Sequence, residues 1–316
     1  MTNTLTHNSL KKFGIKLAAF FFVIFIADAI IGFELKKYYY KQVAGYDYET
    51  TYAINKTQAE IVILGSSRAA NLLNSDIFEN KLNKSCYNAG RSGCSIFYHY
   101  AILKSILKRY SPKMVILSFD AGNFSINNES YDRIAILLPY YKAHTEIKDV
   151  VELKGPYEKL KMLSCIYSYN SLLLPILSGN TENSKIKYAN IKGYTPINEV
   201  IKDGPLQKFN YLKEKKLDSV KINIFKSFLQ LCIDSNIELF IVCSPYLINA
   251  NGVDSSIIEA KKIAQNKGVI FADYSKDSFY MKRSYLFADF RHLNATGVDY
   301  FSNDVITFIK TNNKML

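Results

Sequence analysis

The sequence predicts an α/β fold, a three-layer α/β/α flavodoxin-like sandwich around a mostly parallel five-stranded sheet. Short apolar runs, with the length and β-branched content of buried parallel strands, alternate with longer segments of helical periodicity. This alternation favours βαβ units joined by right-handed crossovers. In such sheets, ligands bind outside the carboxyl ends of the strands. The predicted strands are residues 61–64, 85–88, 115–119, 237–243 and 269–272.

Helical periodicity marks the segments between and after these strands. In the last of them, Val298, Phe301 and Val305 recur at spacings of three and four, so they line one buried face of a helix. A chain of 316 residues is long enough for one domain of this kind with an insertion. The predicted helices are residues 96–109, 218–234, 255–266 and 295–310.

The α/β domain is expected to span residues 58–316, with a helical insertion at about residues 127–218 between the third and fourth strands. Residues 131–151 and 157–177 are expected to be helical, separated by a Gly-Pro break. Insertions over strand ends are natural lids and substrate walls. The insertion is rich in tyrosine, which favours either stacking on sugar rings or ordinary packing in a core or interface. These tyrosines are Tyr140, Tyr141, Tyr167, Tyr169, Tyr188 and Tyr194.

The N-terminal region is expected to hold a short stub and a membrane anchor in residues 1–35, then a juxtamembrane linker in residues 36–57. Residues 17–33 are apolar except for Asp28, just long enough to cross a bilayer as a helix. Lysines precede them, which is typical of a signal peptide or a signal anchor. We expect an uncleaved anchor, because apolar sequence continues beyond the A-x-A-like pattern and the tyrosines at 38–40 suit a membrane interface. A buried helix of a soluble protein is the alternative.

The size of the domain that follows the anchor indicates the side of the membrane on which that domain lies. Lysines on both sides of the apolar segment nearly balance, so positive-inside counting gives only a slight signal. A large domain behind an N-terminal anchor is usually exported. We therefore expect a single-pass protein of the cytoplasmic membrane, with its domain on the extracytoplasmic side.

Three strand-exit stretches carry the residue types of a serine hydrolase site. They are Gly-Ser-Ser-Arg at 65–68, Asn-Ala-Gly-Arg-Ser-Gly at 88–93 and Asp-Phe-Arg-His at 289–292. A serine nucleophile needs a base within hydrogen-bond reach and a third group that orients the base. Ser67 is the candidate nucleophile, and His292 is the candidate base because Asp289 lies so close before it. Each stretch alone fits a plain turn or a helix cap, so their joint occurrence carries the interpretation.

These stretches resemble the SGNH hydrolases, also called GDSL-type esterases and acyltransferases. The resemblance covers roughly residues 58–125 and 237–310. It implies that Ser67 is the nucleophile, with Asp289 as the orienting group and His292 as the base.

The same resemblance implies an oxyanion hole formed by the Ser67 backbone, Gly93 and Asn123. Two positions depart from the family pattern. Ser66 stands where the family has aspartate, and the third motif, Gly-x-Asn, aligns loosely with Gly122 and Asn123. With a shift of the alignment, Asp120 becomes the polar group at that strand end.

The resemblance and the expected location imply hydrolysis or transfer of an O-acyl ester, in particular O-acetyl, on a cell-envelope or extracellular carbohydrate. Water as the acceptor gives an esterase, and a sugar hydroxyl gives a transferase. One alternative is a non-catalytic anchored protein that binds glycan or an envelope assembly partner. Another is an anion-binding module built on residues 65–68, although that turn lacks the glycines and the Lys-Ser/Thr ending of a P-loop.

Net charge and cysteine content limit the classes of partner and cofactor that we expect. The formal charge is +12, but the lysines are scattered without a basic stripe, so nucleic acid is not expected as a partner. An anionic membrane surface, an acidic glycan or a merely solvated lysine-rich surface each fits the charge. The five cysteines form no close pair and no zinc-ligand spacing, so we expect neither a disulfide framework nor a metal, and no cofactor.

Overall fold

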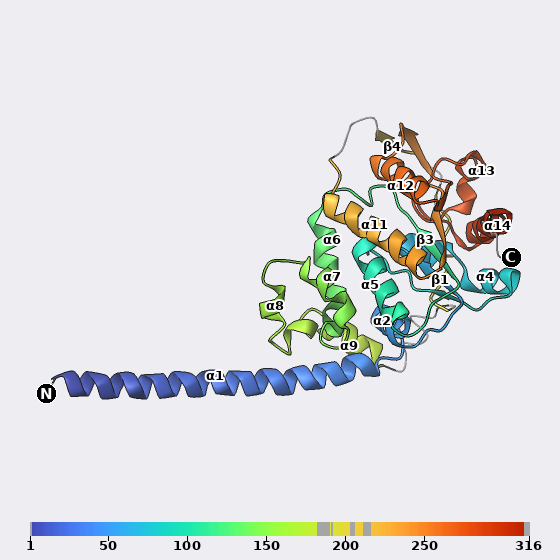
Figure 1. The fold of residues 1–316 in the computed structure, drawn as a ribbon. Helices are drawn as coiled ribbons and strands as arrows, with labels where there is room; N and C mark the ends of the chain where they lie inside the picture. The colour runs from blue at the N-terminus through green and yellow to red at the C-terminus, as the bar shows by residue number, and fades with distance from the viewer. Residues whose placement is uncertain (1, 182–189, 191, 203–205, 211–215, 313–316) are drawn as a thin grey trace.

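The computed structural model describes residues 2–181, 190, 192–202, 206–210 and 216–312 (Figure 1). At its centre lies a five-stranded parallel sheet with the order β2-β1-β3-β5-β7. This is the flavodoxin-like order, so the predicted fold class is confirmed. The strands are β1 Ile61–Leu64, β2 Cys86–Asn88, β3 Met114–Ser118, β5 Glu238–Cys243 and β7 Ile270–Asp273.

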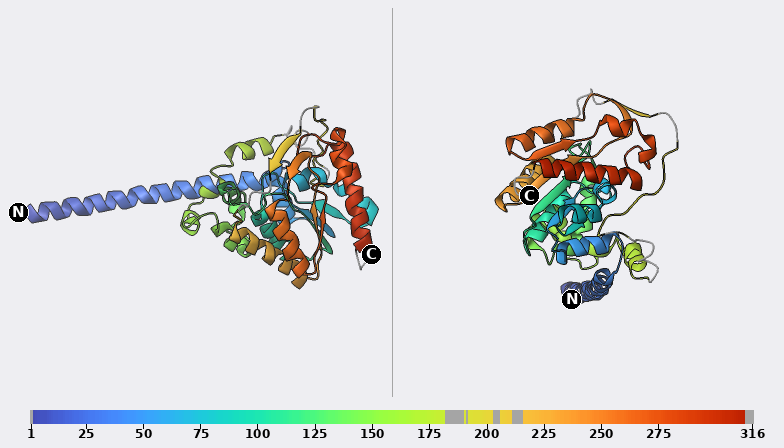
Figure 2. Two further views of the ribbon diagram at one scale, coloured as in Figure 1. Left: turned by 90° about the horizontal axis from the view of Figure 1, so that it is seen from above. Right: turned by 90° about the vertical axis from the view of Figure 1, so that its right-hand side faces the viewer.

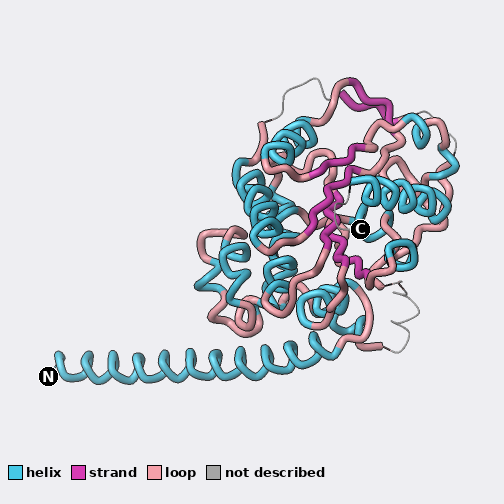
Figure 3. Tube along the Cα trace, turned by 45° about the vertical axis from the view of Figure 1, so that its right-hand side comes forward, coloured by secondary structure: helices cyan, strands magenta, loops and turns pink. Residues whose placement is uncertain are grey.

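Successive residues of a strand point to opposite faces of the sheet. In β1 and β3 all of these residues are buried, so both faces are covered. Val62 and Val115 belong to one hydrophobic core, while Ile61 and Met114 belong to the other. Helices cover both faces, as Figure 3 shows with the strands between them. The first core includes residues of α2 Tyr46–Asn55, α5 Ile96–Leu107, α11 Ser219–Asp234 and α12 Ser255–Asn266. The second includes residues of α3 Ser67–Leu72, α4 Ser75–Leu82, α13 Ser278–Met281, η4 Ser284–Leu286 and α14 Ala295–Asn312.

A second, two-stranded parallel sheet was not predicted. It pairs β4 Gln207–Asn210 with β6 Ile248–Asn251. Both strands are short and polar, so they lack the apolar run that marks a buried strand in a sequence. Ile248 of β6 lies beside the candidate site, where it lines the pocket described below.

The insertion after β3 differs from the prediction of two long helical sections. It consists of short α-helices and 3₁₀ turns, with Gly155 and Pro156 between two of them and Pro139 inside another. Its described elements are α6 Asn128–Asp132, η1 Arg133–Tyr140, η2 Thr145–Ile147, α7 Lys148–Glu152, α8 Glu158–Lys161, η3 Tyr167–Tyr169 and α9 Leu173–Gly179. Tyr140, Tyr169 and Tyr194 are buried in the core, so they pack rather than present rings to a ligand. Tyr188 lies outside the described residues.

The N-terminal helix α1 runs from Thr2 to Lys41, well beyond the predicted apolar segment, and projects from the domain (Figures 1 and 2). It contains one stretch long and apolar enough to cross a membrane, and none of its most apolar window is buried. The expectation that the tyrosines at 38–40 lie at a membrane interface is wrong for Tyr39. Tyr39 is buried and its hydroxyl bonds that of Tyr140 at 2.9 Å, while Tyr40 donates to the Pro139 carbonyl. The end of α1 packs on the insertion instead.

Candidate active site

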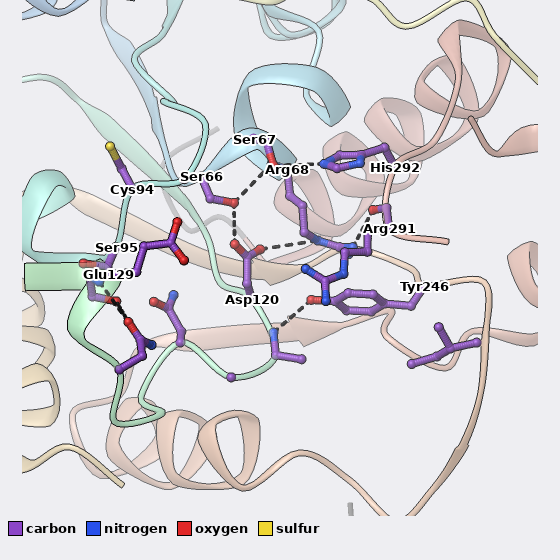
Figure 4. A pocket seen from close by; sticks show the side chains of 17 residues that line it. Ser66, Ser67, Arg68, Cys94, Ser95, Asp120, Glu129, Tyr246, Arg291 and His292 are labelled. Carbon is purple, nitrogen blue, oxygen red and sulfur yellow. Dashed lines mark hydrogen bonds and ion pairs between the residues drawn. The ribbon is translucent and has the colours of Figure 1, made fainter. Parts of the chain in front are cut away.

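The candidate site lies at the carboxyl end of the parallel sheet. The loops that leave β1, β2, β3 and β5 meet there, because the carboxyl ends of parallel strands share one edge. They enclose a pocket of about 350 Å³, together with the loop that precedes α14 (Figure 4). Ser67, Gly93, Asn123 and His292 all line this pocket, and Asp289 stands behind His292.

Ser67 is held at the pocket wall by a tight strand-to-helix turn. Gly65 has φ of +153°, and a Cβ there would come within 2.8 Å of the Cβ atoms of both Ala69 and Ser118. Only glycine fits that approach without strain. Ser66 then caps α3, accepting a hydrogen bond from the Arg68 N–H at 3.2 Å. Ser67 is the first residue of the helix, so its own N–H has no acceptor within the helix.

A chain of hydrogen bonds joins Ser67, His292 and Asp289. The Ser67 Oγ lies 2.9 Å from His292 Nε2, across 225 positions of sequence. His292 Nδ1 lies 2.9 Å from one Asp289 carboxylate oxygen and 3.1 Å from the other. With the proton on Nδ1, Nε2 is free to accept the proton of the serine hydroxyl. The arrangement is therefore capable of general-base activation of Ser67.

Asp289 is built to remain a carboxylate. Burial acts to raise its pKa, but the hydrogen bond from His292 and those from the backbone N–H groups of Arg291 and His292 outweigh burial. The resulting pKa is about 2. The group is therefore ionised at neutral pH, and its two oxygens orient the imidazole through Nδ1.

The expected oxyanion residues lie at the same pocket. Gly93 has φ of +73°, in the left-handed region that favours glycine, and faces the guanidinium of Arg133. Asn123 belongs to a turn after β3 in which its N–H donates to the Asp120 carbonyl at 3.2 Å. Both residues line the pocket, and so does Asp120, the alternative polar group of that loop.

Arg68 is a residue of the site whose role the sequence did not reveal. Its side chain is buried and donates to the backbone carbonyls of Arg291 at 2.6 Å, Ser244 at 2.5 Å and Pro245 at 3.1 Å. Its guanidinium also lies 3.5 Å from the centre of the Tyr246 ring. Arg68 thus ties the serine turn to the loop after β5 and to the residue beside His292. The only signal in the sequence was its place next to Ser67.

Asp120 completes this buried cluster. Its carboxylate accepts a hydrogen bond from the Ser66 hydroxyl and pairs with Arg68 Nε at 3.3 Å (Figure 4). Burial raises the Asp120 pKa, and Arg68 and Ser66 offset only part of that shift. The Ser66 hydroxyl therefore bonds Asp120 while the Ser67 hydroxyl bonds His292, so the two adjacent hydroxyls have separate partners.

The chain was compared with family models, curated sequences and solved structures. No family model matches the chain, and no curated protein sequence matches it. Among solved structures, the chain is similar to the crystal structure of a putative acylhydrolase from Bacteroides fragilis, with 13% sequence identity and a TM-score of 0.38. The match covers 81% of this chain and 89% of that chain.

Proposed function

We propose that this protein is a membrane-anchored serine enzyme of the SGNH type that hydrolyses or transfers an O-acyl ester, in particular O-acetyl, on a cell-envelope or extracellular carbohydrate. One observation carries the proposal. A continuous hydrogen-bonded chain runs from the Ser67 hydroxyl through His292 to Asp289, at the wall of an open pocket. Nucleophile, base and orienting group in this relation are what acyl transfer through a serine ester requires.

In the proposed reaction, Ser67 Oγ attacks the ester carbonyl while His292 Nε2 takes the hydroxyl proton. Asp289 stabilises the imidazolium that forms. His292 then returns the proton to the leaving alkoxide, and an acyl-Ser67 remains. Water, or a second sugar hydroxyl, gives its proton to His292 and attacks the acyl group. The bond between the acyl carbon and Ser67 Oγ breaks, and His292 returns the proton to Oγ. Water makes the enzyme an esterase, and a sugar makes it a transferase.

Negative charge on the tetrahedral intermediate needs donors close to Ser67. The Ser67 N–H, at the start of α3, and the Gly93 N–H are the proposed backbone donors, with the Asn123 side chain as a third. Loss of one such donor typically lowers kcat by about 10²–10³. The loop carrying Asn123 is anchored from the far side, where the Gly122 N–H donates to Asp254 at 2.8 Å.

The polar part of the pocket lining supports a hydroxyl-rich substrate. Away from Ser67 the wall includes hydroxyl, amide, carboxylate and guanidinium groups that are suited to sugar hydroxyls. Residues contributing these groups are Ser95, Asn127, Glu129, Ser130 and Arg291. The carbohydrate itself is proposed from the resemblance to the SGNH hydrolases and from the apolar helix α1, which we propose anchors the domain outside the cytoplasmic membrane.

Ser67→Ala tests the proposal. We expect it to abolish turnover of 4-nitrophenyl acetate while the thermal unfolding of the protein is unchanged. Ser111→Ala is the matched control, because that hydroxyl is exposed, donates to the Ser235 carbonyl and lies outside the pocket. It should retain turnover. A Ser67→Ala protein with the wild-type rate would exclude Ser67 as the nucleophile and would favour a binding protein.

A further inference from the structure

Asp28 lies within the apolar stretch of α1, yet its carboxylate is fully engaged by the insertion. It accepts hydrogen bonds from the Ser164 hydroxyl at 2.5 Å, the Cys165 N–H at 2.6 Å and the Ile166 N–H at 3.2 Å. These bonds satisfy a charged group that would otherwise be costly in an apolar environment. The loop at 164–166 is therefore fixed at the level of Asp28 along the helix.

This level lies inside the apolar stretch rather than beyond its end. Apolar sequence continues from Ala29 to Phe33, and five residues of α-helix at 1.5 Å each span about 7.5 Å. Gly32, in the same stretch, is buried against the insertion, since a Cβ there would lie 2.3 Å from the Cys165 Cβ. Ile30 and Phe33 stay exposed, at 61% and 65%. The insertion thus reaches down beside a part of α1 whose outer face is still apolar.

The turn around α8, residues 157–163, precedes this loop and presents apolar side chains outward. Tyr157, Leu160 and Leu163 recur at a spacing of three and are 66%, 64% and 71% exposed. The intervening Glu158 and Met162 point inward and are buried. Figure 1 places α8 above the C-terminal half of α1, on the side of α9 that faces the N-terminus of that helix.

The α8 turn is a firm structure rather than a loose loop. Glu158 accepts hydrogen bonds from the Tyr167 hydroxyl and from Lys161, each at 2.8 Å. Lys159 pairs with Glu152 at 3.2 Å, and its side chain is otherwise exposed. The turn therefore holds three apolar side chains outward beside two lysines, a composition typical of surfaces that lie in a membrane interface.

We propose that the α8 turn dips into the outer leaflet beside α1, so that Tyr157, Leu160 and Leu163 form a second membrane contact of the domain. This inference rests on the proposed anchoring of α1. The bilayer is the occupant that the geometry favours, because the turn directly precedes the loop that Asp28 fixes inside the apolar stretch of α1. An apolar helix face that lies in the membrane interface is buried to a depth of about 5–10 Å. The rise of α1 from Asp28 to Phe33, about 7.5 Å, falls within this range.

The chain contains no tryptophan, so single tryptophans report membrane depth in the full-length protein. Three variants are compared in lipid nanodiscs that contain brominated phosphatidylcholine. Leu160→Trp probes the turn, Phe21→Trp, at a 60% exposed site of α1, probes the anchor, and Ile258→Trp, at a 55% exposed site of α12, is the control outside both. Nanodiscs of unbrominated lipid give the reference intensity for each.

We expect quenching and a blue-shifted emission for Leu160→Trp and Phe21→Trp, and neither for Ile258→Trp. If Phe21→Trp is quenched but Leu160→Trp is not, the membrane contact of the turn is wrong and the anchor stands. If Phe21→Trp is also unquenched, the anchoring itself is wrong. A blue shift of Leu160→Trp without quenching would mean that protein covers the turn, which also overturns the inference. Turnover of 4-nitrophenyl acetate by the same variants tests the catalytic proposal separately.

Discussion

At the scale of single residues, two adjacent serines have different tasks because their partners differ. Ser66 caps α3 and bonds Asp120, while Ser67 bonds His292. A serine hydroxyl is a weak nucleophile without a base, so the second contact matters chemically. Asp289 fixes which imidazole nitrogen carries the proton, since its carboxylate accepts only from a protonated Nδ1.

Asp289→Asn should therefore lower kcat for 4-nitrophenyl acetate roughly 10³–10⁴-fold, because an amide can hold the imidazole in the wrong tautomer. Asp277→Asn is the matched control. Asp277 also caps a backbone N–H, that of Phe279 at 2.8 Å, but it lies outside the pocket. Steady-state kinetics measures both. Equal rates in the wild type and in Asp289→Asn would remove the orienting role from the mechanism.

At the scale of elements, the contact between α1 and the insertion determines how the domain stands on its helix. Asp28 engages residues 164–166, and farther along α1 the Tyr38 carbonyl accepts from Asn180 at 2.9 Å. The buried Tyr39 adds a packed anchor at the same end. The helix and the domain thus share contacts over several turns, so α1 is held in a defined direction relative to the pocket.

Asp28→Ala is expected to loosen this junction, because the Ser164 hydroxyl and the amides of Cys165 and Ile166 lose their acceptor. Leaving such groups unpaired costs about 1–3 kcal/mol each when they are buried. Hydrogen exchange in detergent should accelerate at residues 164–169. Glu34→Ala is the control on the same helix, since that side chain is exposed and pairs only with Lys37. Unchanged exchange in Asp28→Ala would argue against the junction.

At the scale of the whole molecule, successive side chains of β1 and β3 point to opposite faces of the sheet and pack into two cores, one on each face. The apolar runs that form these strands, and their lengths, are local properties, so the sequence predicts the sheet and its crossover helices well. The broken insertion, the β4–β6 pair and the role of Arg68 depend on contacts between distant segments. Asp28 is the clearest example, because its partners lie more than a hundred residues away. The residues of the Ser67–His292–Asp289 chain were found from motif order, and the structure supplies their distances.

Global stability is expected to depend on pH through His99, which is fully buried in α5. Burial lowers the His99 pKa to about 3, against about 6.5 in an unfolded chain. Between these values the unfolded state binds the additional proton, so stability falls as pH falls below 6.5. The slope is at most about 1.4 kcal/mol per pH unit. Denaturant unfolding at pH 7 and pH 5 should show a smaller difference for His99→Gln than for the wild type. An identical difference in both proteins would contradict the buried, neutral His99.

The central claim is that Ser67 is an activated nucleophile. Reaction of the full-length protein with a fluorophosphonate, followed by peptide mass spectrometry, tests it most directly. The account predicts a single adduct on Ser67, none on the neighbouring Ser66, and loss of labelling in His292→Ala. An unlabelled Ser67 in the folded protein, or labelling that persists without His292, would contradict it.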